Sequence, residues 1–256
     1  MLRPLPDGRF QLLLSGEERR RRLRAARLLL IFTPDLSGSE PLEALSEAMG
    51  HVDVVQVRPK PLGDRRADAP PGATVTRARE AARLCREVLA LRASLDLATP
   101  PLVMVNDRVD VAAALAGEGL DGAHVGADDT PPEVAREVLG EELLLGLSTH
   151  TPADVAMALD APVDLLGFGP VFPTATKGYG AQPASPAHPE VVGPERAWLA
   201  AASASVPVFP IGGIDHSNAD QLDRVGRAAV GSAILGAEDP AVAARGLRRL
   251  LESGED

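Results

Sequence analysis

An amide and two cations alternate along one short segment of the chain. Gln56, Arg58 and Lys60 are spaced two residues apart, so on an extended strand their side chains lie on one side. Pro59 stands between the two cations and can redirect Lys60. This group is suited to an anion attached to a polar ring. A solvated strand end with scattered charges is the alternative.

Two carboxylates follow apolar segments further along. Asp107 comes directly after residues 102–106, and Asp129 comes shortly after residues 122–125. Carboxylates from neighbouring strand ends can share one Mg²⁺, which prefers oxygen ligands and often keeps substrate phosphates among them. N-capping of the following helix is the alternative for each residue. For the pair we favour metal binding, so Asp107 and Asp129 are predicted Mg²⁺ ligands.

Hydroxyl groups and a lysine follow the next two apolar segments. Ser148 ends the segment 143–148, and Thr174, Thr176 and Lys177 lie in a loop after residues 165–168. Hydroxyl donors and an ammonium group can bind phosphate oxygens.

Glycines follow the last two apolar segments. Gly213 and Gly231, the latter followed by Ser232, would let backbone N–H groups approach an anion closely. Glycines serving tight turns only are the alternative. Together with the cations, these residues predict two anion sites and a reaction between two phosphorylated small molecules.

Eight short apolar segments must position these residues. They are 28–33, 52–57, 102–106, 122–125, 143–148, 165–168, 208–211 and 228–233. Helical spacing is found at 77–91, 108–116, 132–139, 152–159, 217–224 and 240–251. Alternating strands and helices in about 250 residues predict an α/β fold, a closed (β/α)8 TIM barrel with its site at the carboxyl ends of the strands. An open Rossmann-type sheet is the runner-up, but no G-x-G-x-x-G follows the first strand.

We expect one barrel domain over residues 28–256, preceded by an extension over residues 1–27 that forms an extra N-terminal helix. A targeting peptide or a basic arm are weaker alternatives for the extension. The loops 61–74 and 178–189 are rich in Gly and Pro and are lid candidates, with a disordered surface loop as the alternative for 61–74.

Composition excludes several classes of function. The 26 basic and 36 acidic side chains give a net charge of −10, which argues against nucleic acid as the main partner. No apolar run approaches the ~18 residues of a membrane span. The one cysteine, Cys85, excludes a disulfide framework and is expected to be a buried thiol. A cytoplasmic protein with small-molecule substrates is expected, and its oligomeric state stays open.

In their order, these motifs resemble the thiamine-phosphate synthase family. The family's Q-x-R-x-K, N-D-R, G-x-H-x-G-Q-x-D, G-x-S-x-H-T, G-F-G-P-x-x-x-T-x-T-K and I-G-G-I motifs correspond here to residues 56–60, 106–108, 122–129, 146–151, 167–177 and 211–214. The chain departs from the pattern at Pro59, where the family has glutamate, and at Ala127, where it has glutamine.

The resemblance implies a transferase that couples hydroxymethylpyrimidine diphosphate to thiazole phosphate and releases diphosphate, assisted by Mg²⁺ on Asp107 and Asp129. It assigns catalytic roles at the diphosphate to Arg58, Lys60, Lys177 and Ser148. The implied substrate-binding residues are Gln56, Arg58, Lys60, Asn106, Ser148, Thr174, Thr176, Lys177, Gly213, Gly231 and Ser232.

Three alternative hypotheses for the function stay open. They are a thiazole tautomerase-like isomerase that acts with a histidine, a different phosphate-binding barrel enzyme, and a barrel that binds thiamine precursors without catalysis. His124 is the histidine in question, and we expect it to be a hydrogen-bonded structural residue.

Overall fold

A computed structural model describes residues 2–4, 10–38, 40–59, 73–126, 129–174 and 190–252. Eight parallel strands form the sheet at its centre: β3 (Leu28–Phe32), β4 (Val54–Val57), β5 (Leu102–Asn106), β6 (Gly122–Val125), β7 (Leu144–Thr149), β8 (Leu165–Phe168), β9 (Val208–Pro210) and β10 (Ala228–Val230). Their order is β10-β3-β4-β5-β6-β7-β8-β9. A parallel bridge between Ile211 and Ala229 joins the two edges, so the predicted TIM barrel is confirmed.

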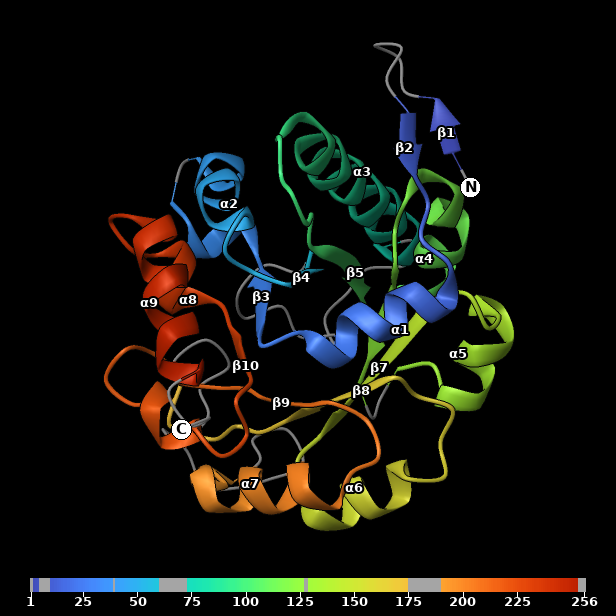
Figure 1. The fold of residues 1–256 in the computed structure, drawn as a ribbon. Coiled ribbons are helices and arrows are strands. Elements are labelled where there is room, and N and C mark those ends of the chain that lie inside the picture. The colour runs from blue at the N-terminus through green and yellow to red at the C-terminus, as the bar shows by residue number, and fades with distance from the viewer. Residues whose placement is uncertain are drawn as a thin grey trace.

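Helices surround these strands (Figure 1). They are α2 (Pro41–Met49), α3 (Ala73–Ser94), α4 (Val109–Leu115), α5 (Pro132–Leu139), α6 (Pro152–Ala158), α7 (Gly193–Ser203), α8 (Ser232–Leu235) and α9 (Pro240–Glu252). The helices α2, α7 and α8 were not predicted from the spacing of apolar residues. The helix expected at 217–224 is a short 3₁₀ turn, Ala219–Leu222. The strand expected to reach residue 233 ends at Val230, because Ser232 already begins α8.

Side chains of the strands alternate between two hydrophobic cores, except that β6 contributes only to the larger one. Leu28, Leu30 and Phe32 of β3 pack in the larger core, together with apolar side chains of the surrounding helices. Leu29 packs in a smaller core inside the barrel with residues such as Met104 of β5. Both faces of every strand are therefore covered, which explains why the strand sequences are almost continuously apolar.

The N-terminal segment forms a hairpin, β1 (Leu2–Pro4) with β2 (Phe10–Leu12), and then α1 (Gly16–Ala25). The helix was expected, whereas the hairpin was not. Figure 1 shows α1 lying across one end of the barrel. Leu23 of α1 and the adjoining Ala26 are buried in the inner core, so this segment covers that end.

A repeated aspartate joins the strands at the end that α1 covers. Asp53, Asp121 and Asp164 directly precede β4, β6 and β8. Each carboxylate accepts a hydrogen bond from a backbone N–H of the preceding strand segment: from Leu28 at 3.0 Å, Val103 at 2.9 Å and Leu145 at 2.9 Å.

Arginines neutralise these carboxylates. Asp53 pairs with Arg248 of α9 at 2.9 Å. Asp121 pairs at 2.9 Å with both Arg19 of α1 and Arg92 of α3. Asp164 likewise holds two arginines at 2.7 Å, Arg20 of α1 and Arg136 of α5. The strand starts and α1 are therefore fixed by one set of ion pairs.

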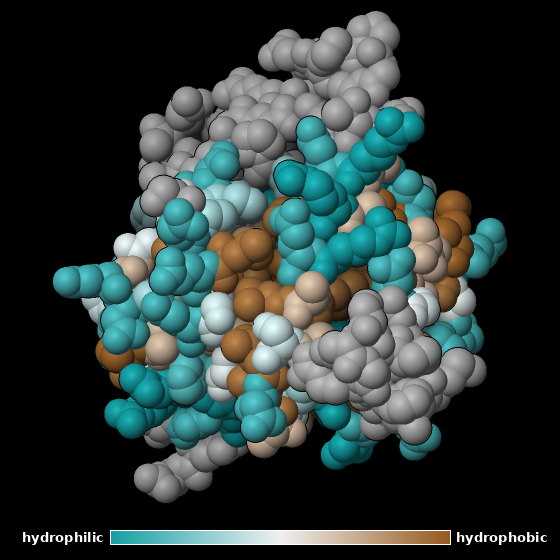
Figure 2. Space-filling model, turned by 90° about the horizontal axis from the view of Figure 1, so that it is seen from above, coloured by the Kyte–Doolittle hydropathy of each residue, from teal (hydrophilic) through white to brown (hydrophobic). Residues whose placement is uncertain are grey.

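Hydrophilic side chains cover much of the side seen in Figure 2, with hydrophobic side chains visible in patches between them. Met157 and Leu199 are among the exposed apolar residues. Within the described ranges, no helix combines the length and the apolar character needed to cross a membrane.

Candidate active site

A pocket lies at the carboxyl ends of the strands, opposite α1. Most of the predicted site residues line it: Gln56, Arg58, Asn106, Ser148, Thr174, Gly213, Gly231 and Ser232. Lys60, Thr176 and Lys177 lie outside the described residues, as do the proposed lid segment 178–189 and most of the segment 61–74.

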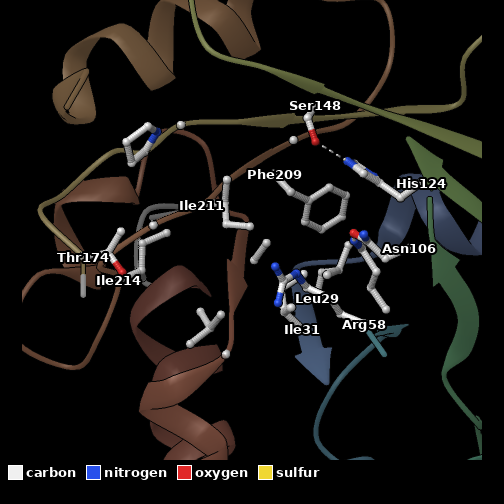
Figure 3. A pocket seen from close by; sticks show the side chains of 18 of the residues that line it. Leu29, Ile31, Arg58, Asn106, His124, Ser148, Thr174, Phe209, Ile211 and Ile214 are labelled. Atoms are coloured by element: carbon white, nitrogen blue, oxygen red, sulfur yellow. Dashed lines mark hydrogen bonds between the residues drawn. The ribbon is translucent and has the colours of Figure 1, made fainter. Parts of the chain in front are cut away.

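Four polar side chains from β4 to β7 form one wall of the pocket. Gln56 Nε2 donates to Asn106 Oδ1 at 2.7 Å. His124 Nε2 and Ser148 Oγ are hydrogen-bonded at 3.0 Å, as the dashed line in Figure 3 marks. Each residue occupies an inward position of its strand, so adjacent strands bring them together.

Arg58 extends this wall just beyond β4. Its backbone N–H donates to the carbonyl of Phe32 at 2.8 Å, which continues the pairing of β4 with β3 and fixes the residue at the barrel mouth. Figure 3 places Thr174 and Ile214 on the far side of the pocket from Arg58 and Asn106. The pocket therefore has a polar, cationic side and a second side formed by the loops after β8 and β9.

The floor of the pocket is apolar. It includes Leu29, Ile31, Leu165, Phe209 and Ile211. These residues were not among the predicted site residues. Period-two alternation along β3, β8 and β9 is the signal that would have found them, because it places them inside the barrel. An apolar floor beneath polar walls suits flat heterocycles that carry charged groups.

Glycines form the rim after β9 and β10. Gly213 has a φ of +66°, and a Cβ at this position would lie 2.4 Å from the carbonyl oxygen of Pro173. Only glycine fits this turn without displacing the loop after β8. Gly231 and Ser232 line the same pocket, so these three residues lie together at its rim.

The two candidate metal ligands follow neighbouring strands, β5 and β6. Both side chains are half-buried. Helix α4 begins after Arg108 and α5 after Pro131, so neither Asp107 nor Asp129 is an N-cap residue, which removes the alternative role. Asp107 is also the one non-glycine residue with positive φ, +62°, in the described part of the chain, and such backbone strain is frequent at functional sites.

The carboxylate pair fits a magnesium ion in donor chemistry. Among the described residues, no group of three or more His, Cys, Asp or Glu that could hold a metal is found. Asp107 and Asp129 are not among the residues that line the pocket. Mg²⁺ is commonly bound by one or two carboxylates completed by water and substrate phosphate. Asp129 Oδ2 also accepts from the N–H of Gly126 at 2.8 Å, which holds this carboxylate close to the end of β6.

Thr149 and His150, which were not among the predicted site residues, also line the pocket. His150 Nδ1 is hydrogen-bonded to the carbonyl of Gly169, and its backbone N–H donates to Asp154 at 2.8 Å. Thr149 Oγ1 donates to the carbonyl of Gly167 at 2.9 Å. Both side chains are thus tied to their surroundings and shape the wall.

Comparison with known proteins identifies relatives of the same kind. The model of the family described as thiamine monophosphate synthase matches residues 28–234. The chain is 44% identical over 147 residues to thiamine-phosphate synthase of Haloquadratum walsbyi, covering 57% of this chain and 62% of that protein. It is 37% identical over 241 residues to thiamine-phosphate synthase of Synechococcus sp. (strain CC9605), covering 93% of this chain and 59% of that protein. The chain therefore spans about three fifths of the length of these two relatives.

A solved structure shows the same similarity at the level of the fold. Thiamine phosphate pyrophosphorylase from Pyrococcus furiosus superposes with a TM-score of 0.69 at 30% identity, covering 93% of this chain and 99% of that one. The similarity therefore includes the barrel and is not limited to a set of motifs.

Proposed function

This chain belongs to the thiamine monophosphate synthase family, and on that premise we propose that it is the transferase that joins a pyrimidinylmethyl diphosphate to a thiazole phosphate. The observation that carries the proposal is the assembly of two groups in one pocket. The polar wall with Arg58 faces the inside of the barrel from β4 to β7, and the rim of Gly213, Gly231 and Ser232 follows β9 and β10.

The reaction breaks the bond between the pyrimidine methylene carbon and the diphosphate oxygen. Diphosphate leaves with the electron pair, and the thiazole nitrogen forms a new bond to the resulting pyrimidinylmethyl cation. Thiamine phosphate and diphosphate are the products, with CO₂ in addition where the thiazole is carboxylated. The main demand on the protein is stabilisation of the negative charge on the leaving group.

The side chains of the polar wall are suited to that demand. The guanidinium of Arg58 neutralises diphosphate oxygens, and Asn106 and Ser148 add hydrogen bonds. Gln56, which is held by Asn106 at 2.7 Å, orients the aminopyrimidine. Lys60 and Lys177, outside the described residues, would add two further cations to the same group.

The other side of the pocket is assigned to the thiazole. Thr174 and Thr176 would hold the ring, and backbone and hydroxyl groups of Gly213, Gly231 and Ser232 would hold its phosphate. Asp107 and Asp129 would hold Mg²⁺, which as a Lewis acid would lower the free-energy cost of charge on the diphosphate.

Release of diphosphate by the purified protein tests this function. We expect release to require the pyrimidine diphosphate, the thiazole phosphate and Mg²⁺ together. Asp107→Asn and Asp129→Asn should each raise the Mg²⁺ concentration needed for half-maximal rate by about tenfold or more, whereas the exposed Asp96→Asn should leave it unchanged.

The other outcomes distinguish the rival functions. Binding of either substrate without release would indicate a non-catalytic binding barrel. Metal-independent isomerisation of a carboxylated thiazole, sensitive to His124→Ala, would indicate a tautomerase. Unchanged Mg²⁺ dependence in both aspartate variants would reject the metal site while leaving the transferase function intact.

A further inference from the structure

We propose that His124 is a positioning residue that directs the Ser148 hydroxyl as a hydrogen-bond donor toward an anion in the pocket. The inference rests on the proposed function, which places Ser148 against the diphosphate. His124 is 6% exposed, and its Nε2 is 3.0 Å from Ser148 Oγ. Ser148 is half-buried and lines the pocket, so His124 acts on a ligand through Ser148.

Two glycines make room for the histidine ring inside the barrel. A Cβ at Gly146 of β7 would lie 2.2 Å from His124 Nδ1, and a Cβ at Gly167 of β8 would lie 3.3 Å from Cε1. Glycine weakens a buried strand, and in a strand it often marks a close approach by another group. Here that group is the imidazole, which is confined against the backbones of two successive strands.

This confinement fixes the direction from which the ring meets Ser148. His124 is paired with Gly146 in the register of β6 with β7, and Ser148 is paired with Gly167 in the register of β7 with β8. The ring therefore reaches Ser148 across the position that Gly146 leaves open. Any larger residue at position 146 would separate the two side chains.

The chemistry of the ligand decides the direction of this hydrogen bond. When Nε2 carries the proton it donates to Ser148 Oγ, and the Ser148 O–H is then available to donate to a diphosphate oxygen. In the opposite tautomer the serine donates to the ring and presents only lone pairs, which repel an anion. An anionic ligand therefore favours the tautomer protonated on Nε2, and the histidine holds the hydroxyl in the orientation that the ligand needs.

A double-mutant cycle tests this role. His124→Phe fills the ring position without a hydrogen bond, and Ser148→Ala removes the hydroxyl. We expect His124→Phe to weaken the binding of inorganic diphosphate, measured by calorimetry, by about tenfold. In the Ser148→Ala background the same change should have less than about a twofold effect, because the group through which it acts is gone. His124→Gln, whose amide nitrogen can donate from a similar position, should restore most of the affinity.

If His124→Phe lowers the affinity for diphosphate equally with and without the Ser148 hydroxyl, the proposal is overturned. It is also overturned if His124→Gln binds diphosphate no more tightly than His124→Phe. Should His124→Phe fail to fold, Gly167→Ala replaces it in the cycle. That change pushes the ring by a few tenths of an ångström while both side chains remain, and its effect on diphosphate binding should again depend on Ser148.

The same measurements separate this proposal from the function on which it rests. A protein that binds diphosphate but never releases it from substrates would reject the transferase function, and the binding cycle would still decide the role of His124. A wild-type protein that binds no diphosphate would overturn the positioning role.

Discussion

Replacement of Asp121 by asparagine should destabilise the protein more than any exposed ion-pair change. The carboxylate is 2% exposed and lies between Arg19 and Arg92, which are 4% and 8% exposed. It also accepts the N–H of Val103. Asp121→Asn removes the negative charge and leaves both guanidinium groups buried at the closed end of the barrel.

The expected loss of unfolding free energy depends on the hydrogen bonds that Arg19 and Arg92 keep in the variant. Removing one member of a buried ion pair costs about 3–5 kcal/mol. Arg19 keeps hydrogen bonds to the carbonyls of Leu14 and Glu142, and Arg92 keeps those of Pro101 and Gly119. These remaining acceptors place the expected loss near the lower bound, about 3 kcal/mol.

Urea unfolding followed by circular dichroism measures this loss. With a slope of about 3 kcal/mol per molar urea, the unfolding midpoint should fall by about 1 M. Glu118→Gln is the control, because its pair with Arg86 is solvent-exposed, at 30% and 56%. Exposed pairs contribute about 0–1 kcal/mol, so this midpoint should shift by less than about 0.3 M. Equal shifts in the two variants would refute the reasoning that burial makes the Asp121 network important for stability.

Three further predictions concern other parts of the molecule. Gly213→Ala should weaken binding of thiamine phosphate by about tenfold, because its Cβ would lie 2.4 Å from a carbonyl oxygen at positive φ, whereas Gly117→Ala, with nothing within 4 Å, should leave the calorimetric affinity unchanged. Burial raises the pKa of the Cys85 thiol to about 12, so a thiol reagent at pH 8 should label the protein only after unfolding; rapid labelling of the native protein would contradict this. For Asp154, burial raises the pKa but hydrogen bonds from the N–H groups of His150 and Thr151 outweigh it, so the pKa lies below its ordinary value of 3.8. Its ionised form therefore stabilises the fold above pH 3.8, and this contribution is lost as the pH falls through the lowered pKa. Asp154→Ala should lower the free energy of unfolding by about 1 kcal/mol at pH 7. In urea unfolding, the difference in stability between variant and wild type should disappear in acid.

The strands were predictable because each is buried on both faces and so appears as a short apolar run. Helix α7 was not, since it buries Ala197 and Ala200 while exposing Leu199 and part of Trp198. Its apolar residues therefore do not mark one buried face. The position of α1 could not be predicted either. Arginine is usually exposed, whereas Arg19 is buried, and its partner Asp121 lies 102 residues further along the chain.

The site was partly predictable for a geometric reason. Parallel strands of a barrel converge at their carboxyl ends, so polar residues that follow apolar runs meet there. Contacts between strands depend on register, which one sequence does not define. The fit of His124 against Gly146 and Gly167 is such a contact, and it was therefore missed.

Helix α1 is synthesised before every strand of the barrel, yet its anchors come much later. Arg19 meets a carboxylate 102 residues further on, and Arg20 meets one 144 residues further on. At the 5–20 residues per second of translation, the 144 residues that separate Arg20 from its carboxylate take about 7 to 30 seconds to synthesise. A nascent chain that ends before Asp164 therefore carries an arginine-rich helix that lacks at least one of its anchors. Docking of α1 through both arginines requires that the barrel has been made up to the start of β8.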